Sequence, residues 1–456
     1  MKETVVLVGA GSAMFTRGLV ADLIRRNWEG ELRLVDIDPE ALAVAEKLSA
    51  KMLSAGKSPL KLRASVERRD VLKGASAVIC TIGVGGRRAW EQDVFIPRRY
   101  GIYQPVGDSV MPGGTSRALR MIPSMVGVAR DVLDLAPAAL FFNYGNPMGP
   151  VCRAVRKATG AGVVGLCHGV IHVARYLADV LGVPAGELDY TAVGMNHLTW
   201  FTELKSKGHD LMPLLQEKAQ QRIGVVDFAR LGQSFAEAGT LRRDQPAAQG
   251  EDPFTWELVQ LFGAFPAVMD RHVSEFFPHL FPGKGSYYGR TLGVDAYSFE
   301  GTIEYGDKIY AEMTELANAP GPLPKDFFER IGGEHEQVIE IVEAIRRGTG
   351  ARYSVNLPNR GQAPNLPAEA IVESPAVAER GGLRPLPLPP MPSGLAGTLA
   401  TRFQWVETVV EAALEGDRRK AVQALLLDGA VTSVDMAARL ANDLLAVHRQ
   451  YLPQFR

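Results

Sequence analysis

The sequence predicts an α/β protein that begins with a doubly wound parallel sheet and continues into an α+β domain. Three observations lead to this prediction. Short β-branched runs alternate with helix-like segments, a glycine-containing turn joins the first such pair, and the pattern becomes mixed after residue 165. A chain of 456 residues, 46% of them apolar, is long enough for two cores. We therefore expect one domain over residues 1–165 and a second over 166–456.

Hydrophobic periodicity predicts the individual elements. Strands are expected over residues 4–9, 31–37, 75–81, 138–143, 163–167 and 190–204, and helices over 12–26, 41–53, 116–135, 171–181, 403–414 and 434–447. Residues 83–114 are rich in glycine, proline and charge, which favours a long functional loop. Residues 381–394 are too dense in proline to form a helix.

The composition excludes several classes of partner. The 50 lysines and arginines nearly balance the 51 aspartates and glutamates, so the totals show no charge excess suited to nucleic acid or an anionic membrane. No apolar run approaches the roughly 20 residues of a membrane span, and the start of the chain does not resemble a signal peptide. Three unevenly spaced cysteines do not suggest a disulfide framework. We expect a cytoplasmic protein with a small-molecule partner.

A dinucleotide site is predicted at the end of the first strand. Gly9-Ala10-Gly11-Ser12 stands where that strand turns into a helix, so backbone N–H groups can meet a pyrophosphate, and Phe15 follows in the same turn. Asp36 ends the next strand, where it can accept from ribose hydroxyls and would repel the 2′-phosphate of NADP. This unit predicts a Rossmann domain that binds NAD. Since the third glycine of the fingerprint is missing, a Rossmann-like sheet that has lost the site is the alternative.

Two strand ends in the second half carry potential metal ligands. Cys167 follows the strand at 163–167, and His197 lies in Gly194-Met195-Asn196-His197. A thiolate and an imidazole can share a divalent ion and leave positions open for substrate oxygens. A buried cysteine and a core histidine are the alternative interpretation.

The sequence resembles glycoside hydrolase family 4 over nearly its whole length. The resemblance is carried by motifs in family order: Val8-Gly9-Ala10-Gly11-Ser12, the segment from Gly85-Gly86 to Gly101, Gly113-Gly114 with Arg117-Ala118-Leu119-Arg120, Asn143-Tyr144-Gly145-Asn146-Pro147-Met148, Cys167-His168-Gly169, Gly194-Met195-Asn196-His197 and Val355-Asn356-Leu357-Pro358-Asn359. The resemblance implies a lactate-dehydrogenase-like fold, a homodimer or homotetramer, and a glycosidase that needs NAD and a divalent ion such as Mn²⁺.

The family resemblance also implies roles for individual residues. Cys167 and His197 would bind the metal, and Asn146 would contact the sugar hydroxyls that the metal holds. In this family NAD oxidises sugar C3, which acidifies the C2 proton. A base removes that proton, the aglycone leaves, water adds, and the hydride returns to C3. The family therefore departs from the usual mechanism with two carboxylates.

The resemblance gives candidates for the base and the acid. Asp270 matches the segment that carries the base, and Tyr287 and Tyr288 are rivals because some relatives use a tyrosine there. His168 matches the position of the acid. A salt bridge is the alternative role for Asp270, and simple packing is the alternative for His168.

Departures from the family pattern bear on the substrate. Trp90 stands near the place where members that cleave phosphorylated sugars have an arginine, and together with Arg88 it is expected to line the sugar site. The neighbouring Arg87, Arg98 and Arg99 are compatible with an anionic sugar as the substrate, because a guanidinium group binds a carboxylate as well as a phosphate. Cys-His-Gly resembles the uronidase branch, so we expect a non-phosphorylated α-glycoside such as an α-glucuronide or α-galacturonide. An α-galactosidase, an α-glucosidase, a plain NAD-linked sugar or hydroxy-acid dehydrogenase, and an inactive sugar-nucleotide sensor are the alternatives.

Overall fold

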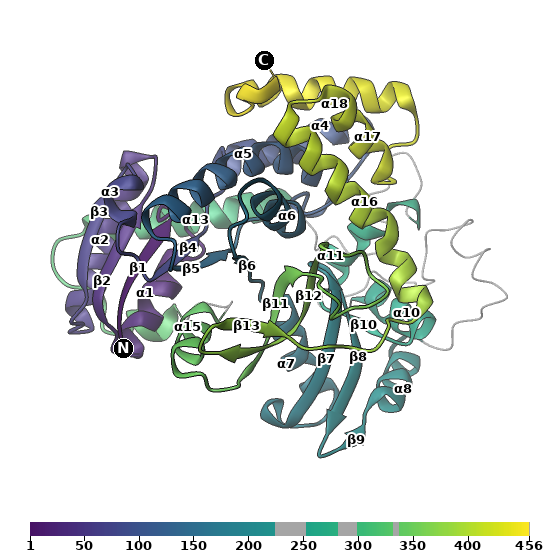
Figure 1. Ribbon diagram of the computed structural model, residues 1–456, viewed down its shortest axis with the longest axis horizontal. Helices are drawn as coiled ribbons and strands as arrows, with labels where there is room; N and C mark the ends of the chain where they lie inside the picture. Colours follow the sequence, from purple (N-terminus) through teal and green to yellow (C-terminus); the bar gives the residue numbers. More distant parts are fainter. Residues whose placement is uncertain (224–251, 281–298, 332–336, 456) are drawn as a thin grey trace.

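One sheet runs through the whole computed structural model, which describes residues 1–223, 252–280, 299–331 and 337–455 (Figure 1). Its first part has the parallel strand order β3-β2-β1-β4-β5-β6 of a doubly wound domain. These strands are β1 (Lys2–Val8), β2 (Glu29–Val35), β3 (Lys61–Ser65), β4 (Ala77–Cys80), β5 (Leu140–Asn143) and β6 (Val163–Gly165).

The second part of the sheet is antiparallel and continues from β6 in the order β11-β12-β7-β8-β10. Its members are β7 (Leu188–Met195), β8 (Leu198–Ser206), β9 (His209–Asp210), β10 (Phe265–Pro266), β11 (Arg352–Pro358), β12 (Ile371–Glu379) and β13 (Gly382–Pro385). Asn356 of β11 pairs with Gly165 of β6, so backbone hydrogen bonds join the two parts. The predicted fold class is confirmed, and the boundary after residue 165 stays a prediction.

Helices cover both faces of the parallel part. The helices of the described chain as a whole are α1 (Thr16–Arg25), α2 (Pro39–Ala55), α3 (Arg69–Leu72), α4 (Gly86–Arg98), α5 (Met111–Leu135), α6 (Met148–Thr159), α7 (Gly169–Leu181), α8 (Met212–Ile223), α10 (Pro253–Phe262), α11 (Asp270–Val273), α13 (Phe299–Asn318), α14 (Phe327–Arg330), α15 (Val338–Arg347), α16 (Ser393–Glu415), α17 (Arg418–Leu427) and α18 (Val434–Val447). Val5 and Leu7 of β1 pack with α1, α2 and α15, whereas Val6 and Val8 pack with α3, α5 and α6. Successive side chains of a strand point to opposite faces, which explains why the last four residues of this strand are all apolar.

The C-terminal helices return to the first domain. In Figure 1, α16, α17 and α18 lie above α4, α5 and α6, and their apolar side chains form one core with α5 and with β7 and β8. No helix in the described ranges is long and apolar enough to cross a membrane.

Two predicted elements were wrong. Residues 83–114 are not one loop, because α4 occupies most of the first half and buries Ala89, Val94 and Ile96. The glycines before this helix and Pro97 in its last turn obscured the helical spacing. The strand predicted over 190–204 is a hairpin, in which Asn196 and His197 form the turn between β7 and β8.

Candidate active site

The glycine turn after β1 has no room for side chains. Gly9 adopts φ +93°, and a Cβ there would lie 2.8 Å from the backbone nitrogen of Ile82. A Cβ on Gly11 would lie 2.6 Å from Ala41 Cβ and 2.8 Å from Asp36 Oδ2. Close approach of backbone to ligand is the reason that dinucleotide turns need glycine here. The turn therefore fits a pyrophosphate.

The remaining predicted cofactor residues surround this turn. The Gly11 N–H donates to Asp36 Oδ2 at 2.8 Å, so the carboxylate at the end of β2 folds over the turn. Ser12 lies within the turn, and Phe15 precedes α1 with its ring 5.1 Å from the ring of Tyr144. All five residues lie together at the carboxyl ends of β1 and β2, the edge of such a sheet where ligands bind.

Cys167 and His197 face each other across the junction of the two sheet parts. Cys167 Sγ lies 3.7 Å from His197 Nε2, although the two residues follow different strands. The Gly169 N–H donates to the same sulfur at 3.4 Å, which favours the thiolate. A sulfur and an imidazole nitrogen at this separation fit a shared divalent ion.

Two further potential ligands were missed by sequence reasoning. Asp108 and His272 each place a donor atom within 4.8 Å of the others and of a donor atom of His197. Asp108 belongs to the irregular segment between α4 and α5, and His272 belongs to α11. The abundance of charge and glycine in residues 83–114 pointed to a functional segment that contains Asp108. His272 lies two residues after Asp270, the residue that the family resemblance suggested as the base.

Hydrogen bonds fix the orientation of the His197 ring. Its Nδ1 lies 2.7 Å from Ser109 Oγ, and the Ser109 hydroxyl donates to Asp108 Oδ1 at 2.8 Å. Since that hydroxyl proton is used, Nδ1–H is the donor to Ser109, and Nε2 keeps its lone pair for a metal. Burial lowers the pKa of His197 despite the opposing effect of Asp108, so the ring is neutral, as a ligand must be.

The charges around Asp108 keep it ionised. Burial alone would raise the pKa of this carboxyl, but His197 in its protonated form, Arg117, His272 in its protonated form and the Asn146 hydrogen bond lower it to about 2. When both imidazoles are neutral, Arg117 and Asn146 still favour the carboxylate. Burial is also the main reason that the pKa of His272 lies well below its ordinary value. The group therefore combines one carboxylate with two neutral imidazoles.

Asn146 and Trp90 lie beside this group, but Arg88 does not. Asn146 Nδ2 donates to Asp108 Oδ2 at 2.9 Å, and Arg117 donates to the backbone oxygen of Asn146. The Arg117 guanidinium stacks on the Trp90 ring at 5.6 Å. Arg88 is exposed and forms ion pairs with Glu91 and with Asp307 of α13, which argues against the predicted contact with substrate.

Asp270 is a helix cap in this structure. The N–H groups of Phe254 and Thr255, at the start of α10, donate to its two carboxylate oxygens, and the Thr255 hydroxyl donates as well. The residue has no exposed surface. Burial and the nearby Asp252 raise its pKa to about 7, against these hydrogen bonds. Three hydrogen bonds from α10 therefore use most of its acceptor positions, which counts against the predicted role as base.

The other acid–base candidates differ in position. His168 is exposed at the start of α7, and its charge contributes, after burial, to the lowered pKa of both His197 and His272. It is thus near the site and open to solvent. Tyr287 and Tyr288 lie outside the described residues.

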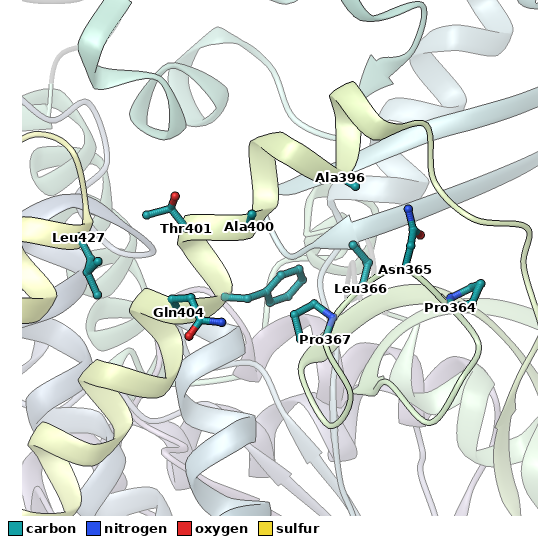
Figure 2. A pocket seen from close by; sticks show the side chains of 10 residues that line it. Pro364, Asn365, Leu366, Pro367, Ala396, Ala400, Thr401, Gln404 and Leu427 are labelled. Atoms are coloured by element: carbon teal, nitrogen blue, oxygen red, sulfur yellow. The ribbon is translucent and has the colours of Figure 1, made fainter.

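A groove elsewhere on the surface is unrelated to this group. About 630 Å³ is enclosed between α16 and the segment after β11, as Figure 2 shows. Its lining is mostly apolar and includes Leu366, Phe403 and Leu427 but none of the predicted site residues.

Comparison with known proteins agrees with the predicted family. The model of the family 4 glycosyl hydrolases matches residues 4–183, and the model of their C-terminal domain matches residues 192–431. An α-glucosidase from Erwinia rhapontici is 31% identical over 98% of this chain and 97% of its own length. An α-galacturonidase from Bacillus subtilis is also 31% identical, over 97% of this chain and 96% of its own.

A solved structure has the same fold. A 6-phospho-α-glucosidase from gut microorganisms, crystallised with NAD and Mn²⁺, superposes with a TM-score of 0.82 at 20% identity and covers 100% of both chains. Its two bound groups are the cofactors that the motifs of this chain predict. Both parts of the family model match this chain and relatives align along almost its full length, so the chain belongs to family 4 of the glycosyl hydrolases.

Proposed function

We propose that this enzyme hydrolyses a non-phosphorylated α-glycoside with the help of NAD and a divalent ion such as Mn²⁺, and that its substrate is a uronide. One observation carries the proposal. Cys167 Sγ and His197 Nε2 lie 3.7 Å apart, beside Asp108 and Asn146, in a chain that also has a dinucleotide turn. A plain dehydrogenase has no need of such a set of metal donors.

The residues present fit both groups. Gly9, Gly11, Ser12, Phe15 and Asp36 would hold NAD. Cys167, His197 and Asp108 would hold the metal, since a thiolate, a neutral imidazole and a carboxylate are all ligands that Mn²⁺-type ions accept. When bound, NAD would supply reversible hydride transfer at sugar C3, and the metal would supply a positive charge that acidifies the C2 proton.

The protein's own side chains would position the sugar and move protons. Asn146 can donate to a ring hydroxyl, and Trp90 supports the Arg117 guanidinium next to it. We assign the base to His272 rather than to Asp270, because its neutral ring lies among the metal donors while most acceptor positions of the Asp270 carboxylate are used. His168, exposed and close by, would protonate the departing oxygen.

The uronide assignment depends on the positive charges. Arg87, Arg88 and Arg98 of α4 are paired with carboxylates of α13 and are not available to a substrate. Arg117 has no ion pair in the described part of the chain, yet it lies beside Asn146 and Asp108. A guanidinium in such a place suits a sugar carboxylate. The α-galacturonidase among the relatives supports this class.

A panel of nitrophenyl glycosides tests the proposal. It should include both uronides, galactosides and glucosides, with NAD, Mn²⁺ and a thiol reductant. We expect cleavage of an α-uronide that depends on both cofactors, with deuterium from solvent at C2 of the product. Products without deuterium would exclude the mechanism, and net accumulation of NADH would indicate a dehydrogenase.

The relatives favour one second candidate. The α-glucosidase from Erwinia rhapontici is as similar to this chain as the α-galacturonidase is. Cleavage of α-glucosides in preference to uronides would therefore support a neutral-sugar glycosidase with the same chemistry. The cytoplasmic location and the homodimer or homotetramer stay predictions.

A further inference from the structure

One buried carboxylate lies directly behind the turn that carries His197. Glu373 belongs to β12 and pairs in register with Gly194 of β7, just before the Asn196-His197 turn. Its exposed fraction is 2%, so the side chain is buried in the protein interior rather than open to solvent. A carboxylate in such a place must be compensated by hydrogen bonds.

The hydrogen bonds of Glu373 hold both sides of this turn. Its Oε2 accepts from the Thr199 hydroxyl at 2.6 Å and from Asn196 Nδ2 at 3.5 Å. Its Oε1 accepts from Asn356 Nδ2 at 3.4 Å. Asn196 precedes His197, and Thr199 follows it by two residues, so one side chain from β12 fastens the turn at each end.

His197 needs this support because its backbone is strained. Its φ is +68°, in the left-handed region that residues other than glycine adopt only when the surroundings impose it. Within the two-residue turn only the second residue, His197, has positive φ, at a position where turns with this feature usually carry glycine or asparagine. The surrounding contacts must therefore select the conformation in which Nε2 points towards Cys167.

We propose that Glu373 is a positioning residue, which fastens the Asn196-His197 turn so that His197 Nε2 is oriented to bind the divalent metal. The proposal rests on the metal site of the proposed function. Glu373 itself does not bind the metal. It acts through Asn196 and Thr199 on the backbone that carries the ligand, in the way that outer contacts orient metal-bound histidines in other proteins.

Metal titration of the full-length chain tests this role. Mn²⁺ alone is added under a thiol reductant to the wild type, Glu373→Met and Glu373→Gln, and binding is followed by calorimetry or by the loss of free Mn²⁺ signal in electron paramagnetic resonance. Methionine fills similar space but accepts no such hydrogen bonds, so we expect affinity about tenfold or more weaker. Glutamine keeps one acceptor oxygen for Thr199 and Asn196, so it should restore most of the affinity.

Two controls separate positioning from general damage. Glu379→Gln changes an exposed glutamate at the end of the same strand, where it pairs with Arg384, and should leave Mn²⁺ affinity unchanged. NADH binding should be the same in all variants, because the hydrogen bonds of Glu373 go to Thr199, Asn196 and Asn356 and none of these residues belongs to the dinucleotide turn. In turnover, Glu373→Met should raise the Mn²⁺ concentration for half-maximal rate more than it lowers kcat at saturating Mn²⁺.

The outcomes are distinguishable. Equal Mn²⁺ affinity of wild type and Glu373→Met would overturn the positioning role, whereas a wild type that binds no Mn²⁺ would instead refute the metal site on which it rests. If Glu373→Met does not fold, the Mn²⁺ affinity of Thr199→Val tests the positioning role instead. This substitution removes the shortest of the three bonds and should weaken Mn²⁺ binding in the same direction, and unchanged affinity would overturn the proposal.

Discussion

Replacing Asp270 by asparagine distinguishes a helix cap from a catalytic base. Oδ1 accepts from the Thr255 N–H at 2.6 Å and from its hydroxyl at 2.7 Å, and Oδ2 accepts from the Phe254 N–H at 3.1 Å. An asparagine oxygen can keep the first two bonds. Its NH₂ group would then face the Phe254 N–H, donor against donor, inside a fully buried site.

The expected change follows from the bond that is lost and the buried charge that is removed. A hydrogen bond to a charged group contributes about 1.5 to 3 kcal/mol, and a buried donor left without a partner costs about 1 to 3 kcal/mol. Burial and Asp252 raise the pKa of the wild-type carboxyl to about 7, which corresponds to a penalty of about 4 kcal/mol on the ionised form at neutral pH, and asparagine avoids this penalty. The two effects nearly cancel, so we expect the free energy of unfolding at neutral pH to change by no more than about 2 kcal/mol. Turnover at a permissive temperature should stay within about tenfold of the wild type.

Thermal melting and C2 exchange measured on the same preparation test this expectation. A suitable control is Asp417→Asn, because Asp417 caps α17 through the N–H groups of Arg419 and Lys420, away from the site. It should lower stability slightly and leave activity unchanged. If the folded Asp270→Asn variant instead loses both turnover and C2 exchange by about a thousandfold, Asp270 is the base and our reassignment is wrong.

Three further variants probe the site. His272→Gln should reduce C2 exchange by at least about a hundredfold while NADH binding persists, and near-normal exchange would show that another group is the base. Gly11→Ala should weaken NADH binding by about tenfold or more, measured by fluorescence, because its Cβ would lie 2.6 Å from Ala41 Cβ, whereas Gly162→Ala has open space and should bind normally. Glu275 is buried, which raises its pKa from 4.5 to about 8. Its contribution to stability should therefore be full below pH 4.5 and be lost as the pH rises to about 8, on the order of 5 kcal/mol. Chemical denaturation at several pH values should show a shallower slope for Glu275→Gln, and equal slopes would contradict this.

The sequence predicted regular elements well where their periodicity was uninterrupted. The helix expected over 434–447 matches α18, and the five strands predicted before residue 168 agree with β1, β2, β4, β5 and β6 to within a few residues, whereas β3 was not predicted. The hairpin was missed because β7 and β8 are continuously buried and mostly apolar next to their turn, over residues 192–195 and 198–201, and the turn has neither glycine nor proline to interrupt the run. Helix α4 was missed for the opposite reason, since glycines and a proline suggested a loop where apolar side chains make a buried face.

The candidate site was predictable only where residues follow strands. Cys167 and the Asn196-His197 pair stand just after β6 and β7, which marked them as candidates. The two strands are separated by β11 and β12, and the row of paired residues from Gly165 to Gly194 across these strands brings the two ends together. Asp108 and His272 come from an irregular segment and a one-turn helix, whose paths depend on packing that periodicity does not encode. Glu373 comes from a strand 176 residues after His197 and reaches the turn only through the register of β12 with β7.

Asp270 and His272 show why local sequence could not decide between neighbours. They are two residues apart in α11, and a helix turns by about 200° over two residues, so their side chains leave it in opposite directions. Asp270 faces the start of α10, where the N–H groups of Phe254 and Thr255 donate to its carboxylate. His272 consequently faces the donors of Asp108 and His197. The identity of the group that meets the substrate thus depends on which side of α11 packs against α10, a contact between two short helices that neither segment specifies alone.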